Sequence, residues 1–92
     1  MAQPPAVRPP DGFKIVYTGA ALPPFYAAEM LRPLVGKTVW VLDSGQRTRS
    51  GELKEVPNVR EDAVEAKAVE FTDERPLYLR GIVCIAVYEP PK

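Results

Sequence analysis

The chain lacks histidine altogether and has a single cysteine among its 92 residues. Without histidine it has no imidazole general base, no serine–histidine or cysteine–histidine couple and no cysteine–histidine zinc site. One cysteine cannot form a disulfide within the chain, so the fold does not depend on an oxidising compartment. We therefore expect a protein that is not an enzyme, with no catalytic residues, no metal site and no cofactor.

Net charge and long apolar runs are missing as well. Twelve basic residues balance twelve acidic ones, whereas general nucleic-acid and membrane binders usually carry a basic excess. The longest apolar stretch near the C-terminus, residues 81–88, is far shorter than the roughly 20 residues that a membrane helix needs. The first residues have no apolar region behind a basic start, which a secretory signal would have. A cytoplasmic protein without membrane contact is expected.

Proline is abundant and unevenly placed, with 11 in the chain and Pro4, Pro5, Pro9 and Pro10 within the first ten residues. Because proline fixes φ and removes a backbone donor, residues 1–12 are predicted to form a flexible proline-rich arm. The remaining residues, 13–92, suffice for a single small domain around one hydrophobic core.

Strand patterns dominate this domain, and one short helix precedes most of them. The helix is predicted between two proline breaks, over residues 25–32. Alternating or β-branched runs bounded by turn residues predict strands at 13–17, 37–42, 46–56, 77–80 and 82–88. Gly51 inside the second hairpin strand indicates a bulge or sharp bend. The run 82–88 is apolar at nearly every position, which predicts burial on both faces or in an oligomer interface.

Residues 61–71 fit two structures. Val64, Ala68 and Phe71 repeat at helical spacing, and Ala, Glu and Lys favour a helix. Alternation fits the same residues, and the strands on either side need a third partner. We adopt the strand, with the helix left open.

The order of a short helix, a hairpin with a bent second strand, a polar strand and two strands joined at Arg-Gly resembles the Sm-like family. Residues 34–45 followed by 51–53 resemble its first motif. Leu79-Arg80-Gly81, followed by Val83 and Ile85, resembles its second motif. The resemblance covers roughly residues 24–88. It implies a mainly β fold, a small five-stranded SH3-like or Sm-like barrel with a short N-terminal helix.

The resemblance also departs from the family pattern where RNA would bind. The segment 57–63 has Asn58 and Asp62 in the opposite order to the family's Asp-x-x-Asn. Val83 stands where the second motif usually has asparagine. The familiar uridine pocket is therefore absent from this sequence, and Asn58 is kept as a candidate nucleic-acid contact.

The other candidate contacts are basic or aromatic. Arg80 lies between Leu79 and Gly81 in an apolar stretch, so its charge must reach solvent, pair with a carboxylate or face a ligand. The resemblance would place Arg80 and Gly81 on the inner face of a ring, against nucleobase or phosphate. Arg47 and Arg49 are two residues apart on one strand, which points both side chains to the same side. They are predicted to contact phosphates, the alternative being a solvated strand face.

Three aromatic residues are candidate platforms for stacking on bases: Trp40, Tyr78 and Tyr88. A place in the hydrophobic core is the competing and favoured interpretation of all three. Cys84, flanked by apolar residues without a basic neighbour, is expected to be a buried and inert thiol.

Two functions follow from these patterns. The first is a non-catalytic Sm-like binding module that forms a homo-oligomeric ring through its strands in 77–87 and binds RNA on the ring's inner face. The second is a small structural barrel that oligomerises or docks a protein partner without nucleic acid. Residues 37–60 hold five basic and three acidic side chains, and residues 61–75 hold two and six. This charge segregation is compatible with self-association as well as with RNA.

Overall fold

The computed structural model describes residues 8–62 and 67–90. In chain order its elements are β1 (Phe13–Leu22), α1 (Pro24–Leu31), the 3-10 helix η1 (Arg32–Leu34), β2 (Thr38–Asp43), β3 (Thr48–Glu55), β4 (Ala68–Phe71), β5 (Leu77–Tyr78) and β6 (Ile82–Tyr88). The protein is therefore mainly β with one short helical segment, which confirms the predicted class.

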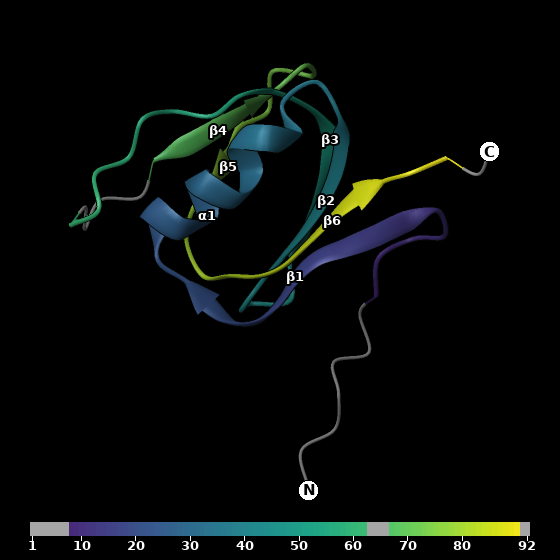
Figure 1. The fold of residues 1–92 in the computed structure, drawn as a ribbon, viewed down its shortest axis with the longest axis horizontal. Coiled ribbons are helices and arrows are strands. Elements are labelled where there is room, and N and C mark those ends of the chain that lie inside the picture. Colours follow the sequence, from purple (N-terminus) through teal and green to yellow (C-terminus); the bar gives the residue numbers. More distant parts are fainter. Residues whose placement is uncertain (1–7, 63–66, 91–92) are drawn as a thin grey trace, which may run out of the picture.

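All six strands belong to one antiparallel sheet with the order β1-β6-β2-β3-β4-β5. The sheet curves around α1, so that the helix lies on its concave side (Figure 1). The order is open, because β1 and β5 each have a single strand neighbour in the described part of the chain. The five-stranded barrel implied by the resemblance is wrong by one strand, because the resemblance covers roughly residues 24–88 and leaves out the strand predicted at 13–17.

The additional strand in the sheet is β1. Residues 13–17 predicted a short strand, but the strand continues to Leu22 and pairs with β6. Its register against β6 shifts at Val16 and again after Thr18. Because a bulge puts successive side chains out of phase, the second half of β1 does not show the alternation that identifies a strand in sequence.

The helix α1 fits closely against the sheet through small side chains. Pro24 occupies its first turn, where the missing N–H costs nothing, and Pro33 follows two residues after its end. Ala27, Ala28 and Leu31 are fully buried against the sheet. Since eight residues cannot form a stable helix alone, this burial is what holds α1 in place.

Strand β6 is buried on both of its faces, as its apolar sequence predicted. One face joins the main core beside α1, and the other joins a smaller cluster built around Trp40. Its two edges are also occupied, by β1 on one side and β2 on the other. The burial of residues 82–87 is thus achieved within one chain and needs no second subunit, while Tyr88 at the end of β6 is 42% exposed.

The ambiguous middle segment 61–71 is a strand in its last four residues. Ala68–Phe71 form β4, which pairs with β3, and residues 61–62 lie in a turn. Residues 63–66, which the sequence assigned to the same strand, lie outside the described residues.

Of the predicted arm 1–12, residues 1–7 also lie outside the described part. The described end of the arm is tied to the sheet. The carbonyl of Gly12 accepts a hydrogen bond from the N–H of Glu89 at 2.9 Å. Neither helical segment in residues 8–62 and 67–90 has the length and apolar character needed to cross a membrane.

Candidate nucleic-acid interface

Three separate segments of the chain meet around one surface cavity of about 450 Å³. They are the turn between β2 and β3, the approach to β5, and the connection from β5 to β6. We call this cavity the arginine groove after the side chains that line it, Arg47, Arg49, Arg75, Arg80 and the exposed Tyr78. The groove brings together four of the predicted contact residues, Arg47, Arg49, Tyr78 and Arg80, which span 33 positions of the sequence.

The turn that carries Arg47 is held by the carboxylate of Asp43. Its Oδ1 accepts hydrogen bonds from the backbone N–H groups of Gly45 and Arg47, each at 2.9 Å. Aspartate commonly closes tight turns in this way. Asp43 also lines the groove, where it is the one acidic side chain beside four guanidinium groups. The lining therefore carries an excess of positive charge.

Gly81 sets the position of Arg80 through the backbone. Its φ of +66° is a left-handed conformation that glycine adopts without steric cost. A Cβ on Gly81 would lie 2.7 Å from Oγ of Ser44, and the Gly81 carbonyl accepts a hydrogen bond from the N–H of Ser44 at 2.7 Å. The Arg-Gly connection is thus pressed against the β2–β3 turn. Because Leu79 is buried and Arg80 is exposed, the guanidinium is turned outward to the groove.

Arg49 is a structural clamp more than an open contact residue. Its Nη2 donates to Oδ1 of Asp73 at 2.6 Å and to the carbonyl of Arg75 at 2.8 Å. Its guanidinium carbon lies 4.1 Å from the centre of the Phe71 ring, which is a cation–π contact. The side chain is 15% exposed, and its Nε is buried without a hydrogen-bond partner among the described residues. Arg49 therefore connects β3 to the 71–75 turn. It lines the groove, but its guanidinium is already engaged by Asp73 and the Arg75 carbonyl.

The carboxyl of Asp73 has a lowered pKa. The main cause is the hydrogen bond from the backbone N–H of Arg75, and the side-chain hydrogen bond and charge of Arg49 act in the same direction. Burial opposes both effects. Because the unfolded carboxyl titrates at its higher ordinary value, Asp73 stabilises the fold above that value. The contribution is lost as the pH falls through the lowered pKa.

We expect Asp73→Asn to lower the midpoint of thermal unfolding at pH 7 and to have a smaller effect at about pH 2, because protonation of the aspartate removes the same charge as the pH falls through its lowered pKa. Asparagine keeps an oxygen for the Arg75 N–H, so the substitution removes mainly the charge. The neighbouring Glu74→Gln is the matched control, since Glu74 forms no ion pair within the described residues. Equal losses for Asp73→Asn at both pH values would contradict the assignment.

The other three arginines of the groove, Arg47, Arg75 and Arg80, remain open to a ligand. Their side chains are exposed, and none has an ion-pair partner within the described residues. Three guanidinium groups around one cavity can bind several oxygens of an anion, because each presents a fork of N–H donors. Tyr78 is 61% exposed beside them and offers a ring for stacking.

Two predicted contact residues lie elsewhere. Asn58 is exposed on the segment after β3 and does not line the groove. Trp40 is 5% exposed and packs with Leu42, Cys84 and Ala86, so the favoured core interpretation of this residue agrees with its position. A base could stack on Trp40 only after this cluster opened. The sequence linked Asn58 to the site by its motif position and Trp40 by its aromatic ring, and the fold separates both residues from the arginines.

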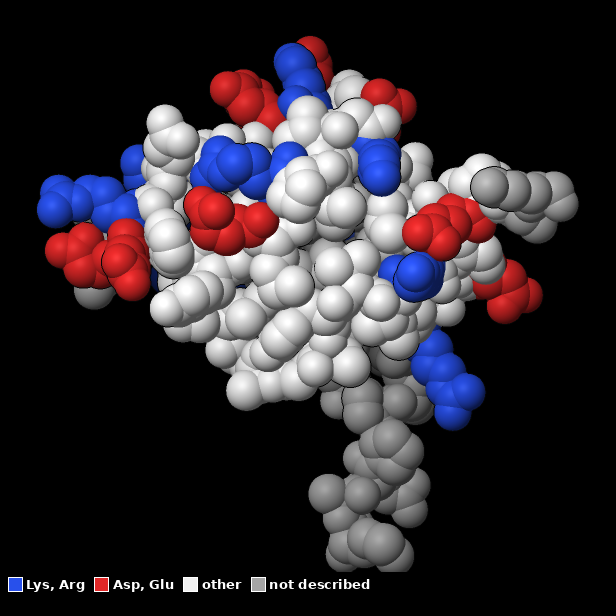
Figure 2. Space-filling view, viewed as in Figure 1, with Lys and Arg blue, Asp and Glu red and all other residues white. Residues whose placement is uncertain are grey.

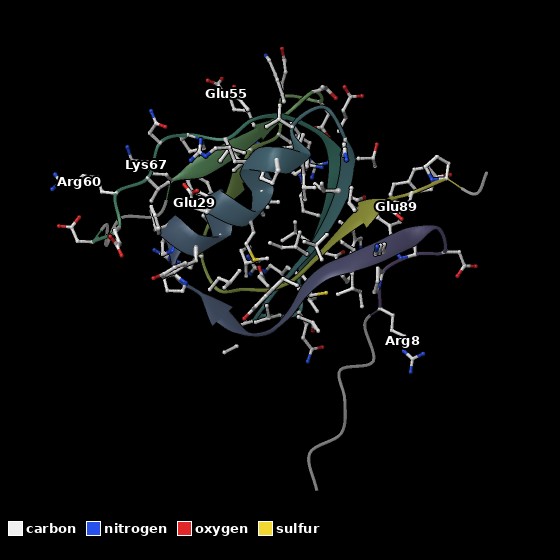
Figure 3. The ribbon with its side chains drawn as sticks, viewed as in Figure 1. Arg8, Glu29, Glu55, Arg60, Lys67 and Glu89 are labelled. Carbon is white, nitrogen blue, oxygen red and sulfur yellow. The ribbon has the colours of Figure 1, made fainter. Side chains whose placement is uncertain are left out.

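The predicted basic surface over residues 37–60 is also divided by the fold. Arg60 lies at the far end of the molecule, pointing away from the body (Figure 3), where it pairs with Asp62 at 3.4 Å. Lys54 lines a different cavity, together with Glu70 and Glu74. Only the arginine side chains near the β2–β3 turn reach the groove.

Arg75 is the groove residue that sequence reasoning missed. It lies in a segment with six acidic side chains, so the local charge indicated an acidic surface. Arg75 lies three residues before the exposed Tyr78, and this spacing could have indicated a basic and aromatic pair. That the pair lies close to Arg47 and Arg80 depends on the tertiary fold.

Cys84 is buried and forms no disulfide. Burial raises the pKa of its thiol, and a hydrogen bond with the Thr18 side chain opposes the shift. A thiol with a raised pKa is a poor nucleophile at neutral pH, as the apolar neighbours predicted. Among the described residues, no three histidine, cysteine, aspartate or glutamate side chains are grouped so that they could hold a metal ion.

Comparison with known proteins gave no match to a family model, to a curated protein or to a solved structure.

Proposed function

We propose that this chain is a non-catalytic binding module that holds single-stranded RNA by its phosphate backbone in the arginine groove. The observation that carries the proposal is the convergence of Arg47, Arg75 and Arg80 on one cavity without carboxylate partners among the described residues. Phosphate oxygens are the acceptors that guanidinium groups bind most effectively. An exposed tyrosine between the arginines suits a single strand, whose unpaired bases can stack on it.

We further propose that the fold is a derivative of the Sm-like or SH3-like small barrel. Following the helix, strands β2 to β5 lie side by side in chain order, and the last strand β6 returns to pair with β2. This order of strands after a short helix supports the proposal. Arg80 of the Arg-Gly pair lines the arginine groove, which supports it as well. The added strand β1 and the absent uridine pocket distinguish this chain from that pattern.

The proposal does not require a ring. Assembly through residues 77–87 needs a free strand edge, but β6 already has β1 and β2 as neighbours. The free part of that region is β5, which has two residues. The arginine groove is complete in one chain, so RNA binding is expected of the isolated module.

Fluorescence anisotropy with labelled U-rich and A-rich RNA tests the proposal. If three phosphates are contacted, the logarithm of affinity falls with the logarithm of salt with a slope of about −2, or about 20-fold between 50 and 200 mM salt. The two RNAs are expected to bind within about threefold of each other, because backbone contacts and stacking do not distinguish base edges.

The variant with Arg47, Arg75 and Arg80 all replaced by alanine is expected to lose at least about tenfold in affinity at low salt and most of the salt dependence. The matched control removes the same charge from three exposed lysines outside the groove, Lys37, Lys54 and Lys67. It should bind nearly as the parent does. Equal losses in both variants would indicate a general charge effect, and absence of binding by the parent at low salt would reject RNA as the ligand.

A further inference from the structure

The longest stretch of this chain without a charged residue includes most of β1, which is an edge strand of the sheet. Residues 15–28 contain no aspartate, glutamate, lysine or arginine, and they span most of β1 and the start of α1. Figure 2 shows the result as a broad uncharged area over β1 and the beginning of the helix, with charged side chains around it. Ile15 and Val16 are 48% and 40% exposed there.

Strand β1 is also the longest strand and the last one in the sheet. One side pairs with β6, and no strand lies against the other side in the described part of the chain. Such an edge presents unpaired N–H and C=O groups to a further strand. Proteins usually protect long edges with lysine, proline, bulges or short length. Strand β1 has ten residues, no proline and Lys14 as its one charge, so its two register shifts against β6 are its main protection.

We propose that β1 pairs antiparallel with β1 of a second copy of this chain, forming a two-fold symmetric dimer whose two six-stranded sheets become continuous. An antiparallel edge is self-complementary, because a two-fold rotation brings each strand's donors opposite the other strand's acceptors. The other sheet edge, β5, has two residues and cannot offer an equivalent ladder for head-to-tail assembly.

The charges of β1 are compatible with pairing against itself. A two-fold axis at Tyr17 places this residue opposite Tyr17 of the second copy and Lys14 opposite Ala20. The two Lys14 residues are then six positions apart along the ladder, or about 20 Å, which exceeds the screening length of about 8 Å at physiological salt. The chain as a whole has no net charge, so two copies have little long-range repulsion to overcome. A strongly charged partner would find no complementary charge on residues 15–28.

Val16, at the bulge, is a position where a substitution is expected to leave the fold of the monomer intact. The register skips from Ile15 to Tyr17, so Val16 stands opposite no residue of β6, and its side chain is partly exposed. In the proposed pairing, Val16→Lys would put two lysines two positions apart across the two-fold axis, about 7 Å along the ladder. Val35→Lys is the matched control, because Val35 is 45% exposed and lies outside β1.

Light scattering after size exclusion, over a range of concentrations, measures the mass. The parent and Val35→Lys should approach twice the chain mass of 10.2 kDa, and Val16→Lys should shift the dimer midpoint at least about tenfold to higher concentration. Hydrogen exchange of the parent gives a readout that needs no variant. Protection of amides in β1 should increase with concentration, while β3 stays unchanged.

A parent that is monomeric at every concentration would overturn the proposal, as would a ring mass of five or more copies. A dimer that persists in Val16→Lys with unchanged exchange in β1 would place the interface elsewhere. If Val16→Lys fails to fold, the exchange experiment decides. None of these outcomes depends on RNA, so the dimer and the proposed function can fail separately.

Discussion

The Phe71→Ala variant is expected to lose about 3–5 kcal/mol of its free energy of unfolding. The Phe71 side chain is 1% exposed and belongs to the main core. On one side it meets the bare backbone of Gly51, where a Cβ would lie 3.0 Å from its ring, and on another side the Arg49 guanidinium. Neither neighbour can readily move into the space, because one has no side chain and the other is held by hydrogen bonds. A cavity therefore remains.

Urea unfolding followed by the fluorescence of Trp40, the single tryptophan, measures this loss. A domain of this size has roughly 5–14 kcal/mol of stability, so the variant should unfold at far lower denaturant. Tyr78→Ala removes an aromatic ring that is 61% exposed and should change stability by less than about 0.5 kcal/mol. A loss below about 1.5 kcal/mol for Phe71→Ala would show that neighbouring groups fill the space left by the ring, and it would contradict tight packing around Phe71.

Arg49→Ala is expected to reduce the free energy of unfolding by about 2 kcal/mol, which is unusual for an arginine on a strand. The substitution removes the cation–π contact with Phe71 and a charged hydrogen bond to the Arg75 carbonyl. It also frees Asp73 from its ion pair. The same urea experiment measures the effect.

Arg47→Ala is the control for Arg49→Ala, since it makes the same change two residues away on an exposed side chain. Its stability should stay within about 0.5 kcal/mol of the parent, while its affinity for RNA falls. Comparing the two variants distinguishes a residue that stabilises the fold from one that contacts RNA. If Arg49→Ala kept full stability and lost RNA affinity as Arg47→Ala does, then Arg49 would be a direct contact, as the two-residue spacing first predicted.

Much of the fold could be predicted from local patterns. Proline at both ends bounded α1, β-branched runs identified β2 and β6, and the apolar run 82–88 predicted burial on both faces. These signals are local, since they depend on dihedral preferences and on which side chains avoid water. The strand predicted at 13–17 is confirmed but too short, because two shifts in register break the alternation that would have extended it to Leu22.

The candidate site was predictable only in part. Arg80 could be identified because a charge in an apolar stretch needs a partner or a ligand, and it is exposed in the groove. Arg49 and Arg47 look equivalent in sequence, yet one is 15% exposed beneath Asp73 and the other is open to solvent. The difference comes from Phe71 and the 71–75 turn, which are more than 20 residues away along the chain.

The sequence by itself determined the absence of histidine and net charge, the mainly β class and the elements with regular side-chain patterns, because composition and local conformation are properties of neighbouring residues. The tertiary structure alone decided which arginines share a cavity, that Asp73 occupies one of them, and that β1 covers one edge of β6 and leaves its own edge free. Such relations depend on long-range strand pairing. It brings together residues that are far apart in the sequence, and local sequence patterns do not show which of them will be neighbours.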